Sequence, residues 1–336
     1  MGSFAILLGL AFLLTFVLLR CLAWKHVVLR RETGQMSVHI VADDLAVIPL
    51  NTPEQPGFRD FISAWLLRVG GEAIVVDPGP ACTVPFLVET LKSLGVHQLT
   101  GAVLTHIHMD HAGGIGQLVR AMPVEWVLAH PRAHRHLLEP VRLWEGSRKV
   151  LGDLADFYGP ILPVDASYLR YDELVPLGGE SLQIIETPGH APHHLSMIVR
   201  DYVFVGEAIG VVVEQEKESY QRPATPPKFL PDIFLASIER LLQADLPDIA
   251  CFGHFGWRKN ARAWMLRGLE QTQRWMEIVG RMPDATVDEV FASLLEQDPF
   301  VARYSSLPED IQQREKYFMS NSIKGMLQMS KANGRQ

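Results

Sequence analysis

The feature that most constrains this chain is a group of four potential metal ligands within residues 106–111. The apolar segment before them, residues 101–104, is typical of a buried strand. Because alternate residues of a strand point the same way, His106 and His108 can face one ion at the end of that strand. Asp110 and His111 follow where the chain turns toward a helix, and they present a second pair in another direction. Imidazole and carboxylate suit zinc, iron or manganese rather than calcium, so the sequence predicts such a metal site.

The composition excludes several classes of protein. Hydrophobic residues make up 48% of the 336 residues and charged residues 21%, as in ordinary globular proteins. The net charge of −7 argues against a general nucleic-acid binder, since no basic field would attract phosphate. Cys21, Cys82 and Cys251 lie far apart without a C-x-x-C pair, so neither a disulfide framework nor a cysteine zinc site is expected.

Short apolar runs alternate with turn signals from residue 38 onward, which predicts strands. The predicted strands are residues 38–41, 45–50, 64–69, 73–76, 101–104, 182–185 and 202–205. Helical spacing covers residues 84–94, a helical insertion covers about 131–160, and residues 257–336 are predicted to be a helical C-terminal region. Within that region, Thr286 with Glu289 and Ser306 with Glu309 form capping-box patterns. This order predicts a layered α/β arrangement.

The first 24 residues are predicted to be a hydrophobic helix that anchors the chain in a membrane. Residues 4–19 are apolar and uncharged, and Arg20, Lys25, Arg30 and Arg31 follow them. Sixteen helical residues span about 24 Å against a hydrocarbon core of about 30 Å, a gap that closes if Arg20 snorkels. Charge after the run rather than before it argues against a cleaved signal.

This anchor predicts membrane association through residues 4–24, with residues 25–37 as a linker and the catalytic domain facing the cytoplasm. Two alternatives stay open. The chain is secreted after signal cleavage, or it is a soluble cytoplasmic protein with a buried apolar arm.

The cluster T-H-I-H-M-D-H-A-G-G at residues 105–114 resembles the signature of the metallo-β-lactamase-fold hydrolase superfamily. The other motifs of that family follow in the expected order, over about residues 38–256. They are V-V-D-P-G at 75–79, T-P-G-H at 187–190, V-G-E-A at 205–208 and F-G-H at 252–254. The resemblance implies an αββα sandwich, of the α/β class, with a metal site on one edge of its two sheets.

The resemblance also implies ligands and a cofactor, two zinc ions per chain, with iron or manganese as alternatives. The first site would use His106, His108 and His190, and the second Asp110, His111 and His254. The family bridges its ions with an aspartate, whereas this chain has Glu207, whose carboxylate reaches about 1.5 Å further. Three roles for Glu207 stay open: it bridges both ions, it binds one ion, or it supports the ligands without binding an ion. Asp77 and His194 are predicted to hold ligands by hydrogen bonds.

The stretch T-P-G-H-x-P-x-H-L-S at 187–196 is most similar to the glyoxalase II-like branch. That similarity implies hydrolysis of a small-molecule ester or thioester by a metal-activated hydroxide, with Asp110 orienting the nucleophile and moving the proton. The apolar helical insertion, with Trp144 and Tyr158, also fits an apolar acyl substrate. Candidate glutathione-binding residues are Arg258, Lys259 and Arg262.

Several alternatives to this hydrolase stay open. A lactonase uses the same ligands, and a persulfide dioxygenase of the same fold uses one iron. A nuclease of the ribonuclease Z type is disfavoured by the acidic charge balance and by the lack of a basic arm. From another class, a non-catalytic, metal-stabilised module at the membrane is favoured only by Glu207 in place of aspartate.

Overall fold

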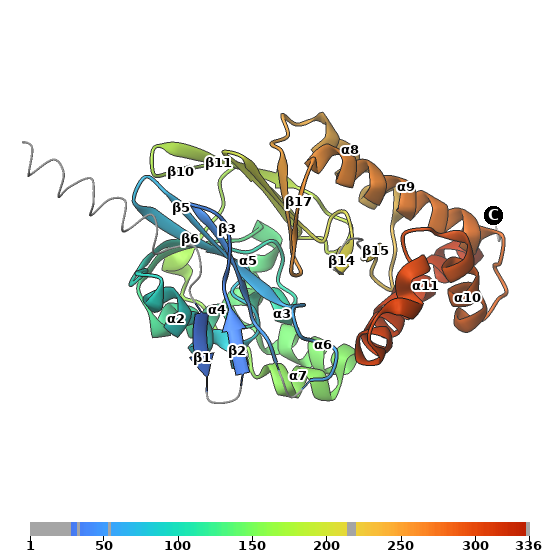
Figure 1. The fold of residues 1–336 in the computed structure, drawn as a ribbon, viewed down its shortest axis with the longest axis horizontal. Coiled ribbons are helices and arrows are strands. Elements are labelled where there is room, and N and C mark those ends of the chain that lie inside the picture. Colours follow the sequence, from blue (N-terminus) through green and yellow to red (C-terminus); the bar gives the residue numbers. More distant parts are fainter. Residues whose placement is uncertain (1–27, 32–33, 53–54, 214–219, 334–336) are drawn as a thin grey trace, which may run out of the picture.

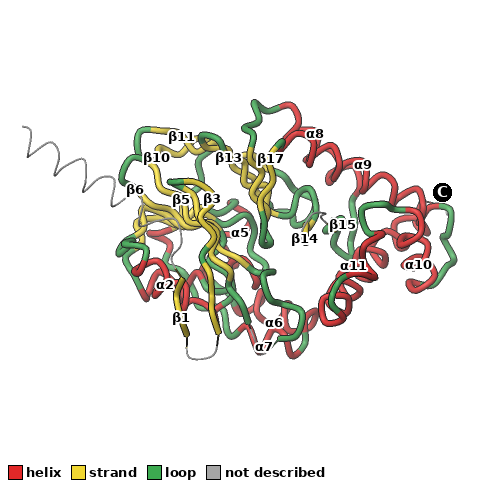
Figure 2. Tube along the Cα trace, in the orientation of Figure 1, coloured by secondary structure: helices red, strands yellow, loops and turns green. Residues whose placement is uncertain are grey.

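The computed structural model describes residues 28–31, 34–52, 55–213 and 220–333 (Figure 1). Two β-sheets pack face to face, and helices cover their outer faces (Figures 1 and 2). The first sheet has the order β3 (His39–Ala42), β4 (Leu45–Pro49), β5 (Ser63–Val69), β6 (Glu72–Val76), β7 (Leu99–Val103), β8 (Val124–Leu128), β9 (Leu169–Arg170). The second has the order β10 (Leu174–Leu177), β11 (Glu180–Glu186), β12 (Leu195–Val199), β13 (Tyr202–Gly206), β16 (Ile249–Phe252), β17 (Trp257–Lys259).

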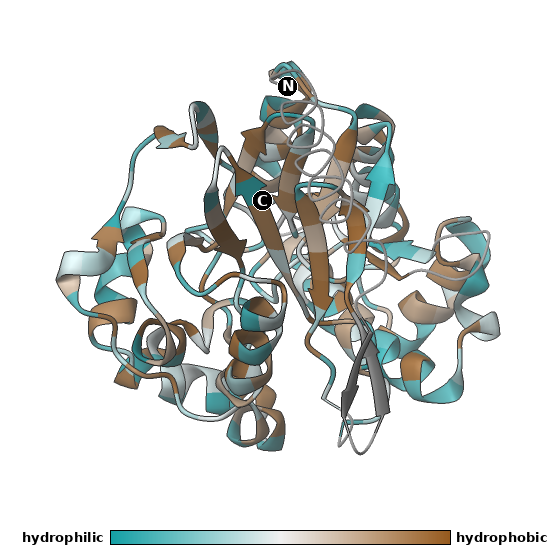
Figure 3. Cartoon of the chain, turned by 60° about the vertical axis from the view of Figure 1, so that its left-hand side comes forward, coloured by the Kyte–Doolittle hydropathy of each residue, from teal (hydrophilic) through white to brown (hydrophobic). Residues whose placement is uncertain are grey.

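Alternation along the strands produces the layers. On β5, Trp65 and Leu67 point into the core between the sheets, whereas Leu66 points into the core under the helices. The strands in the middle of the molecule are accordingly hydrophobic over most of their length (Figure 3). β5 turns into β6 through Gly70 and Gly71, whose φ angles of +54° and +90° suit a tight hairpin.

Helices of the first half cover the first sheet. They are α2 (Val84–Ser93), α3 (Met109–Ala112), α4 (Ile115–Ala121), α5 (Pro131–Leu138), α6 (Val141–Leu151) and α7 (Asp153–Tyr158). The last three of these form the predicted helical insertion. The second sheet packs against the C-terminal helices, whose buried side chains share one core with β13 and β16. These helices are α8 (Pro231–Gln243), α9 (Ala261–Gly280), α10 (Val287–Gln297) and α11 (Glu309–Asn333).

The order of the strands places several strand ends, and the loops that follow them, at one edge of the sandwich. β6 and β7 run parallel in the first sheet, and β13 and β16 run parallel in the second. The indole Nε1 of Trp65 on β5 donates to the carbonyl of Phe252 on β16 at 2.9 Å and ties the two sheets together. Ile62 and His254 form an isolated antiparallel bridge nearby. The carboxyl ends of the parallel strands of both sheets therefore meet at this edge.

The structure differs from the sequence-based boundaries in three places. Residues 28–31 and 34–37, predicted as linker, form the antiparallel pair β1 (Val28–Arg31) and β2 (Gly34–Ser37). β17 extends the second sheet beyond residue 256, because Trp257 pairs with Cys251 before the helices begin. Ser306 does not cap α11, because its hydroxyl donates to the carbonyl of Arg303 and the helix begins at Glu309.

The prediction of a membrane-spanning helix is corrected. Among the residues that the structure describes, no helix is both long and apolar enough to cross a membrane. The apolar run at residues 4–19 and the rest of the predicted anchor, residues 1–24, lie outside the described residues.

The capping box at the start of α10 is confirmed and supports a stability prediction. The hydroxyl of Thr286 accepts a hydrogen bond from the backbone N–H of Glu289 at 3.3 Å, and Glu289 Oε2 accepts from the backbone N–H of Thr286 at 2.7 Å. We expect Thr286→Ala to lower the free energy of unfolding by about 1 kcal/mol, as measured by urea titration. Thr286→Ser keeps the hydroxyl and should stay near the wild type. Equal losses in the two variants would contradict this role for the cap.

Candidate metal centre

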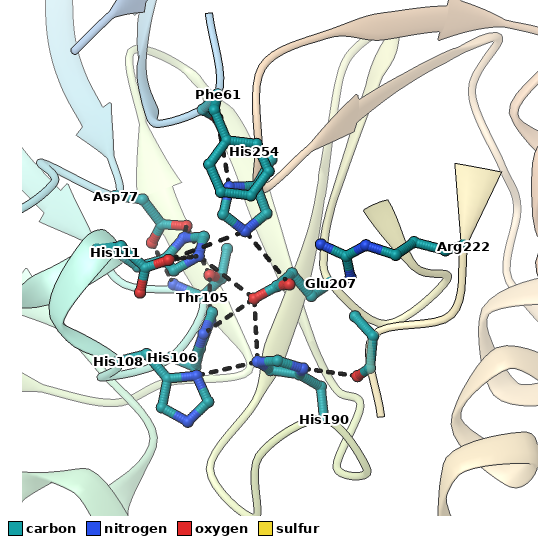
Figure 4. A network of polar contacts seen from close by, with 12 residues as sticks. Phe61, Asp77, Thr105, His106, His108, His111, His190, Glu207, Arg222 and His254 are labelled. Atoms are coloured by element: carbon teal, nitrogen blue, oxygen red, sulfur yellow. Dashed lines mark hydrogen bonds and ion pairs between the residues drawn. The ribbon is translucent and has the colours of Figure 1, made fainter. Parts of the chain in front are cut away.

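The predicted ligands come from four loops at the shared edge of the sheets (Figure 4). His106 and His108 follow β7, and Asp110 and His111 lie on the short helix α3 that begins there. The other three come from later in the chain. His190 lies between β11 and β12, Glu207 directly follows β13, and His254 follows β16.

These side chains form two groups, and within each group the potential ligand atoms lie within 4.8 Å of one another. The first group is His106, His108, His190 and Glu207, and the second is Asp110, His111 and His254. His190 Nε2 lies 3.0 Å from His108 Nδ1 and 3.0 Å from Glu207 Oε2. The structure thus brings together the residues that the sequence assigned to each site, and it adds Glu207 to the first group.

Glu207 lies between the two groups. Its Oε2 is 3.4 Å from Nε2 of His106 and 3.3 Å from Nε2 of His111, while its Oε1 is 3.4 Å from Nε2 of His254. Burial disfavours the charged carboxylate, but attraction to His190 and His254 outweighs it and holds the pKa of Glu207 well below its usual range. Glu207 is therefore an ionised carboxylate facing nitrogens of both groups.

Four of the imidazoles are held from behind through Nδ1, which leaves Nε2 facing the centre. Nδ1 of His190 donates to the carbonyl of Ala224 at 2.7 Å, and Nδ1 of His254 donates to the carbonyl of Phe61 at 3.3 Å. The Nδ1 atoms of His106 and His111 have side-chain partners, each at 3.0 Å: Oγ1 of Thr105 for His106 and Oδ2 of Asp77 for His111. Partners of this kind fix the ring orientation and the tautomer of metal-binding histidines.

Asp77 organises one side of the centre. It is buried, and its carboxylate accepts hydrogen bonds from the backbone N–H of Thr105 at 2.8 Å and from the Thr105 hydroxyl at 2.6 Å. Because that hydroxyl donates to Asp77, it is left to accept from Nδ1 of His106. Asp77 therefore orients His111 directly and His106 through Thr105, a position that fits the supporting role predicted for it.

His194 lies behind Glu207. Its Nε2 accepts from the backbone N–H of Glu207 at 3.0 Å, and its Nδ1 lies 2.8 Å from the hydroxyl of Thr187. Gly206 makes this approach possible, since its φ is +54° and a Cβ there would come within 2.4 Å of His194 Nε2. His194 binds the backbone of Glu207 and not its carboxylate. It therefore fixes the backbone position from which the Glu207 side chain extends.

The donor set fits divalent cations. Nε2 of His106 and Nε2 of His111 are buried and have no hydrogen-bond partner, which is costly for a polar atom that no cation binds. Burial, and after it the neighbouring His111, lower the pKa of His106 well below its usual value, so this ring is neutral with a lone pair at Nε2. Burial also lowers the pKa of His111. The attraction of Asp110 and the hydrogen bond to Asp77 outweigh burial and raise the pKa of His111 above its usual value. A cation can replace the proton of His111.

Asp110 is the more exposed carboxylate of the centre. Its side chain is 19% exposed, against 7% for Glu207. Oδ2 lies 3.7 Å from His111 Nε2 and 3.9 Å from His254 Nε2. Asp110 thus belongs to the second group and also faces the side from which a small molecule can approach.

Of the other residues suggested by the sequence, Arg258 and Arg262 contact groups outside the centre. Tyr158, in contrast, lies near it, since burial and then the carboxylate of Asp110 raise the pKa of Tyr158. The guanidinium of Arg258 stacks on Trp264, and Arg262 donates to the carbonyl of Leu242. Tyr158 is buried and Trp144 half-buried in the core around the first sheet. Phe61, which sequence reasoning missed, stacks on the imidazole of His254 with ring centroids 3.9 Å apart. Thr105 directly precedes the histidine cluster, and this adjacency was the available signal for it.

Comparisons with known proteins agree with this geometry. A family model described as the metallo-beta-lactamase superfamily matches residues 57–254. The metallo-beta-lactamase fold-containing protein ST1585 of Sulfurisphaera tokodaii is 32% identical over 161 residues, which are 46% of this chain and 59% of that protein. A hydroxyacylglutathione hydrolase of Xylella fastidiosa (strain M12) is 31% identical over 205 residues, 59% of this chain and 61% of that enzyme. The chain thus spans about three fifths of the length of these curated relatives.

Solved structures share the fold. The crystal structure of an archaeal metallo-beta-lactamase superfamily protein, ST1585 from Sulfolobus tokodaii, superposes with a TM-score of 0.62 at 23% identity. The match covers 85% of this chain and 98% of that one. Since the family model covers more than half of the chain and the motifs meet in one centre, the chain belongs to the metallo-beta-lactamase superfamily.

Proposed function

We propose that this protein is a metal-dependent hydrolase that cleaves an ester or thioester bond in a small molecule. The observation that carries the proposal is the convergence of two groups of ligand atoms on a buried, ionised Glu207. Family membership supports a metallo-hydrolase, and the hydroxyacylglutathione hydrolase relatives support an acyl thioester as the substrate.

Two zinc ions per chain are the cofactor that best fits the donor set. His106, His108 and His190 would hold one ion, and Asp110, His111 and His254 would hold the other. A bound cation of this type lowers the pKa of water toward neutrality and polarises an acyl oxygen. Oε2 of Glu207 faces nitrogens of both groups and Oε1 faces His254 of the second, which supports a carboxylate shared between the ions over a purely supporting one.

The residues of the chain supply orientation and proton transfer. Asp110 has the more exposed carboxylate, so it is placed to accept a proton from the attacking water and to deliver it to the leaving group. Asp77 and Thr105 keep Nε2 of His106 and His111 directed inward. His194 holds the backbone of Glu207 through a buried hydrogen bond and so fixes the point from which its side chain extends toward the imidazoles.

The alternatives differ in how they account for the second group. A persulfide dioxygenase with one iron gives no role to the convergence of Asp110, His111 and His254. A non-catalytic module is disfavoured for the same reason, since every ligand of both groups is retained. A lactonase shares all these features, because a lactone is a cyclic ester, and it differs only in the shape of the substrate.

The first prediction concerns metal content and activity. Protein purified without added metal should carry two zinc ions per chain by mass spectrometry and hydrolyse members of an ester and thioester panel. His108→Ala should lose about one ion and lower kcat/KM by more than about a hundredfold, because loss of a ligand should exceed the 10–100-fold cost of losing a supporting hydrogen bond. His97→Ala removes an exposed histidine and is the matched control.

Two results would contradict this assignment. Hydrolysis of every substrate by His108→Ala at the wild-type rate would exclude the metal mechanism. One iron per chain, with oxygen consumed in the presence of a persulfide, would identify a dioxygenase instead.

The second prediction concerns Asp77. Asp77 accepts from the backbone N–H of Thr105 at Oδ1 and from the Thr105 hydroxyl and His111 at Oδ2. In Asp77→Asn a single oxygen remains and the amide NH2 faces one set of these donors, so the inward direction of Nε2 is no longer fixed. We expect zinc affinity to fall about 10–100-fold, measured by competition with a chromogenic chelator. Asp245→Asn changes an exposed aspartate and should bind zinc as the wild type does. Unchanged zinc affinity in Asp77→Asn would remove Asp77 from this supporting role.

A further inference from the structure

Two buried arginines share one glutamate beside the metal centre. Arg222, at the end of β15 (Tyr220–Arg222), donates from Nε to Glu315 Oε2 at 2.5 Å, and Arg314 donates from Nε to Glu315 Oε1 at 2.9 Å. The three residues are 3%, 5% and 0% exposed, in the order Arg222, Arg314, Glu315. Two positive charges and one negative charge leave one positive charge unbalanced in the protein interior, where such a charge is costly.

Both guanidinium groups have donors that no hydrogen bond within the described residues uses, and one of these donors is fully buried. Nη1 of Arg314 donates to the carbonyl of Gly57, but Nη2 of Arg314 is buried and has no hydrogen-bond partner. Among the described residues, Glu315 is the hydrogen-bond partner of the Arg222 side chain, through Nε, so its two Nη groups remain for another acceptor. In a purely structural ion pair these donors would be paired with acceptors of the chain. In a binding site for an anion they stay unpaired until the anion binds.

The pair borders the metal centre. The guanidinium of Arg222 points toward the carboxylate of Glu207 (Figure 4). The guanidinium carbon of Arg314 lies 3.8 Å from the ring centroid of Phe61, and His254 stacks on Phe61 at 3.9 Å. Because both groups lie so close to one ring centre, they must occupy opposite faces of Phe61. One aromatic ring therefore separates Arg314 from a predicted zinc ligand.

Glu207 does not complete this charge balance. Its carboxylate lies 3.0–3.4 Å from imidazole nitrogens on the other side, and a cation held there would engage the same oxygens. Glu207 also attracts Arg222, but with its oxygens engaged by a cation the remaining positive charge favours an anion from outside the chain. The walls around the arginines are aromatic, since Arg222 lies 5.1 Å from the ring centroid of Phe318, which packs against Phe61.

We propose that Arg222 and Arg314 bind an oxyanion of the substrate, a carboxylate or a phosphate, while the scissile acyl bond lies at the metal centre. This inference rests on the proposed function and narrows it to esters or thioesters that carry a negative charge. The guanidinium fork matches the geometry of a carboxylate or phosphate, and the aromatic walls suit an apolar stem between the charge and the reacting carbonyl. Arg258, Lys259 and Arg262, the candidates from the sequence, are not needed for it.

The test compares two esters that differ in charge. Zinc-loaded protein is assayed with p-nitrophenyl butyrate, which is neutral, and with mono-p-nitrophenyl glutarate, which carries a carboxylate at the end of the acyl chain. We expect the wild type to favour the charged ester in kcat/KM by at least about tenfold, and Arg222→Met to lose most of this preference. Arg222→Lys keeps the charge but not the fork, so its preference should be intermediate. Arg281→Met, at the exposed C-terminal end of α9, is the control and should keep the wild-type ratio.

A second measurement needs neither metal nor turnover. Inorganic phosphate is titrated by calorimetry into protein stripped of metal with a chelator. Arg222→Met should bind phosphate about tenfold more weakly than the wild type, and Glu315→Gln, which removes the competing carboxylate, should bind it more tightly. Because Glu315→Gln is expected to gain affinity, a general loss of folding cannot mimic the result.

The outcomes separate this inference from the proposed function. Ester hydrolysis with the same charge preference in wild type and Arg222→Met, or equal phosphate affinity in these two proteins, would overturn the oxyanion site and leave the hydrolase intact. Phosphate affinities in the expected order without hydrolysis of any ester would support the oxyanion site and count against the hydrolase. In the first case the three residues serve only to fasten α11 to β15.

Discussion

The carboxylate of Glu207 is the group on which the rest of the centre depends. A buried, ionised carboxylate is stable only where positive charge or hydrogen-bond donors surround it. Here Nε2 atoms of four imidazoles lie within 3.0–3.4 Å of its two oxygens. The backbone N–H of the same residue is fixed by His194, at a glycine turn that leaves no space for a side chain. The backbone of Glu207 is thus held by His194 and its carboxylate by the imidazoles, and the two ligand groups are arranged around this carboxylate.

The sandwich supplies this arrangement because the ligands come from both sheets. His106, His108, Asp110 and His111 follow a strand of the first sheet, and Glu207 and His254 follow strands of the second. Any sliding of one sheet over the other would separate the two sets. The hydrogen bond from Trp65 to the carbonyl of Phe252 and the antiparallel bridge between Ile62 and His254 join the two sheets and oppose such sliding near the centre. Residues of the core between the sheets therefore influence the relative positions of the potential ligands without contacting them.

The residues of the two groups could be named from the sequence because each lies in a short motif that follows a strand, and the structure brings them together. The strands β5 to β7 and the helical insertion could also be predicted, since apolar runs and helical spacing reflect burial. Phe61 and Arg314 could not, because their contact joins residues far apart in the chain and no local pattern encodes it. Ser306 illustrates the opposite case, in which a local motif is present but the predicted cap does not form. The Ser306 hydroxyl donates to the carbonyl of Arg303 within a 3-10 turn that precedes α11.

The same long-range contacts change the meaning of the C-terminal helices. From sequence they follow the catalytic motifs as a separate region, but α11 supplies Arg314, which contacts the carbonyl of Gly57 and the ring of Phe61. It also supplies Glu315, which accepts from Arg222 and Arg314. Phe61 in turn supplies the carbonyl that orients His254 and the ring that stacks on it. A displacement of α11 would remove the support behind one face of that ring and expose two buried charges. The helical region is therefore part of the wall of the active centre, and the catalytic unit does not end at residue 256.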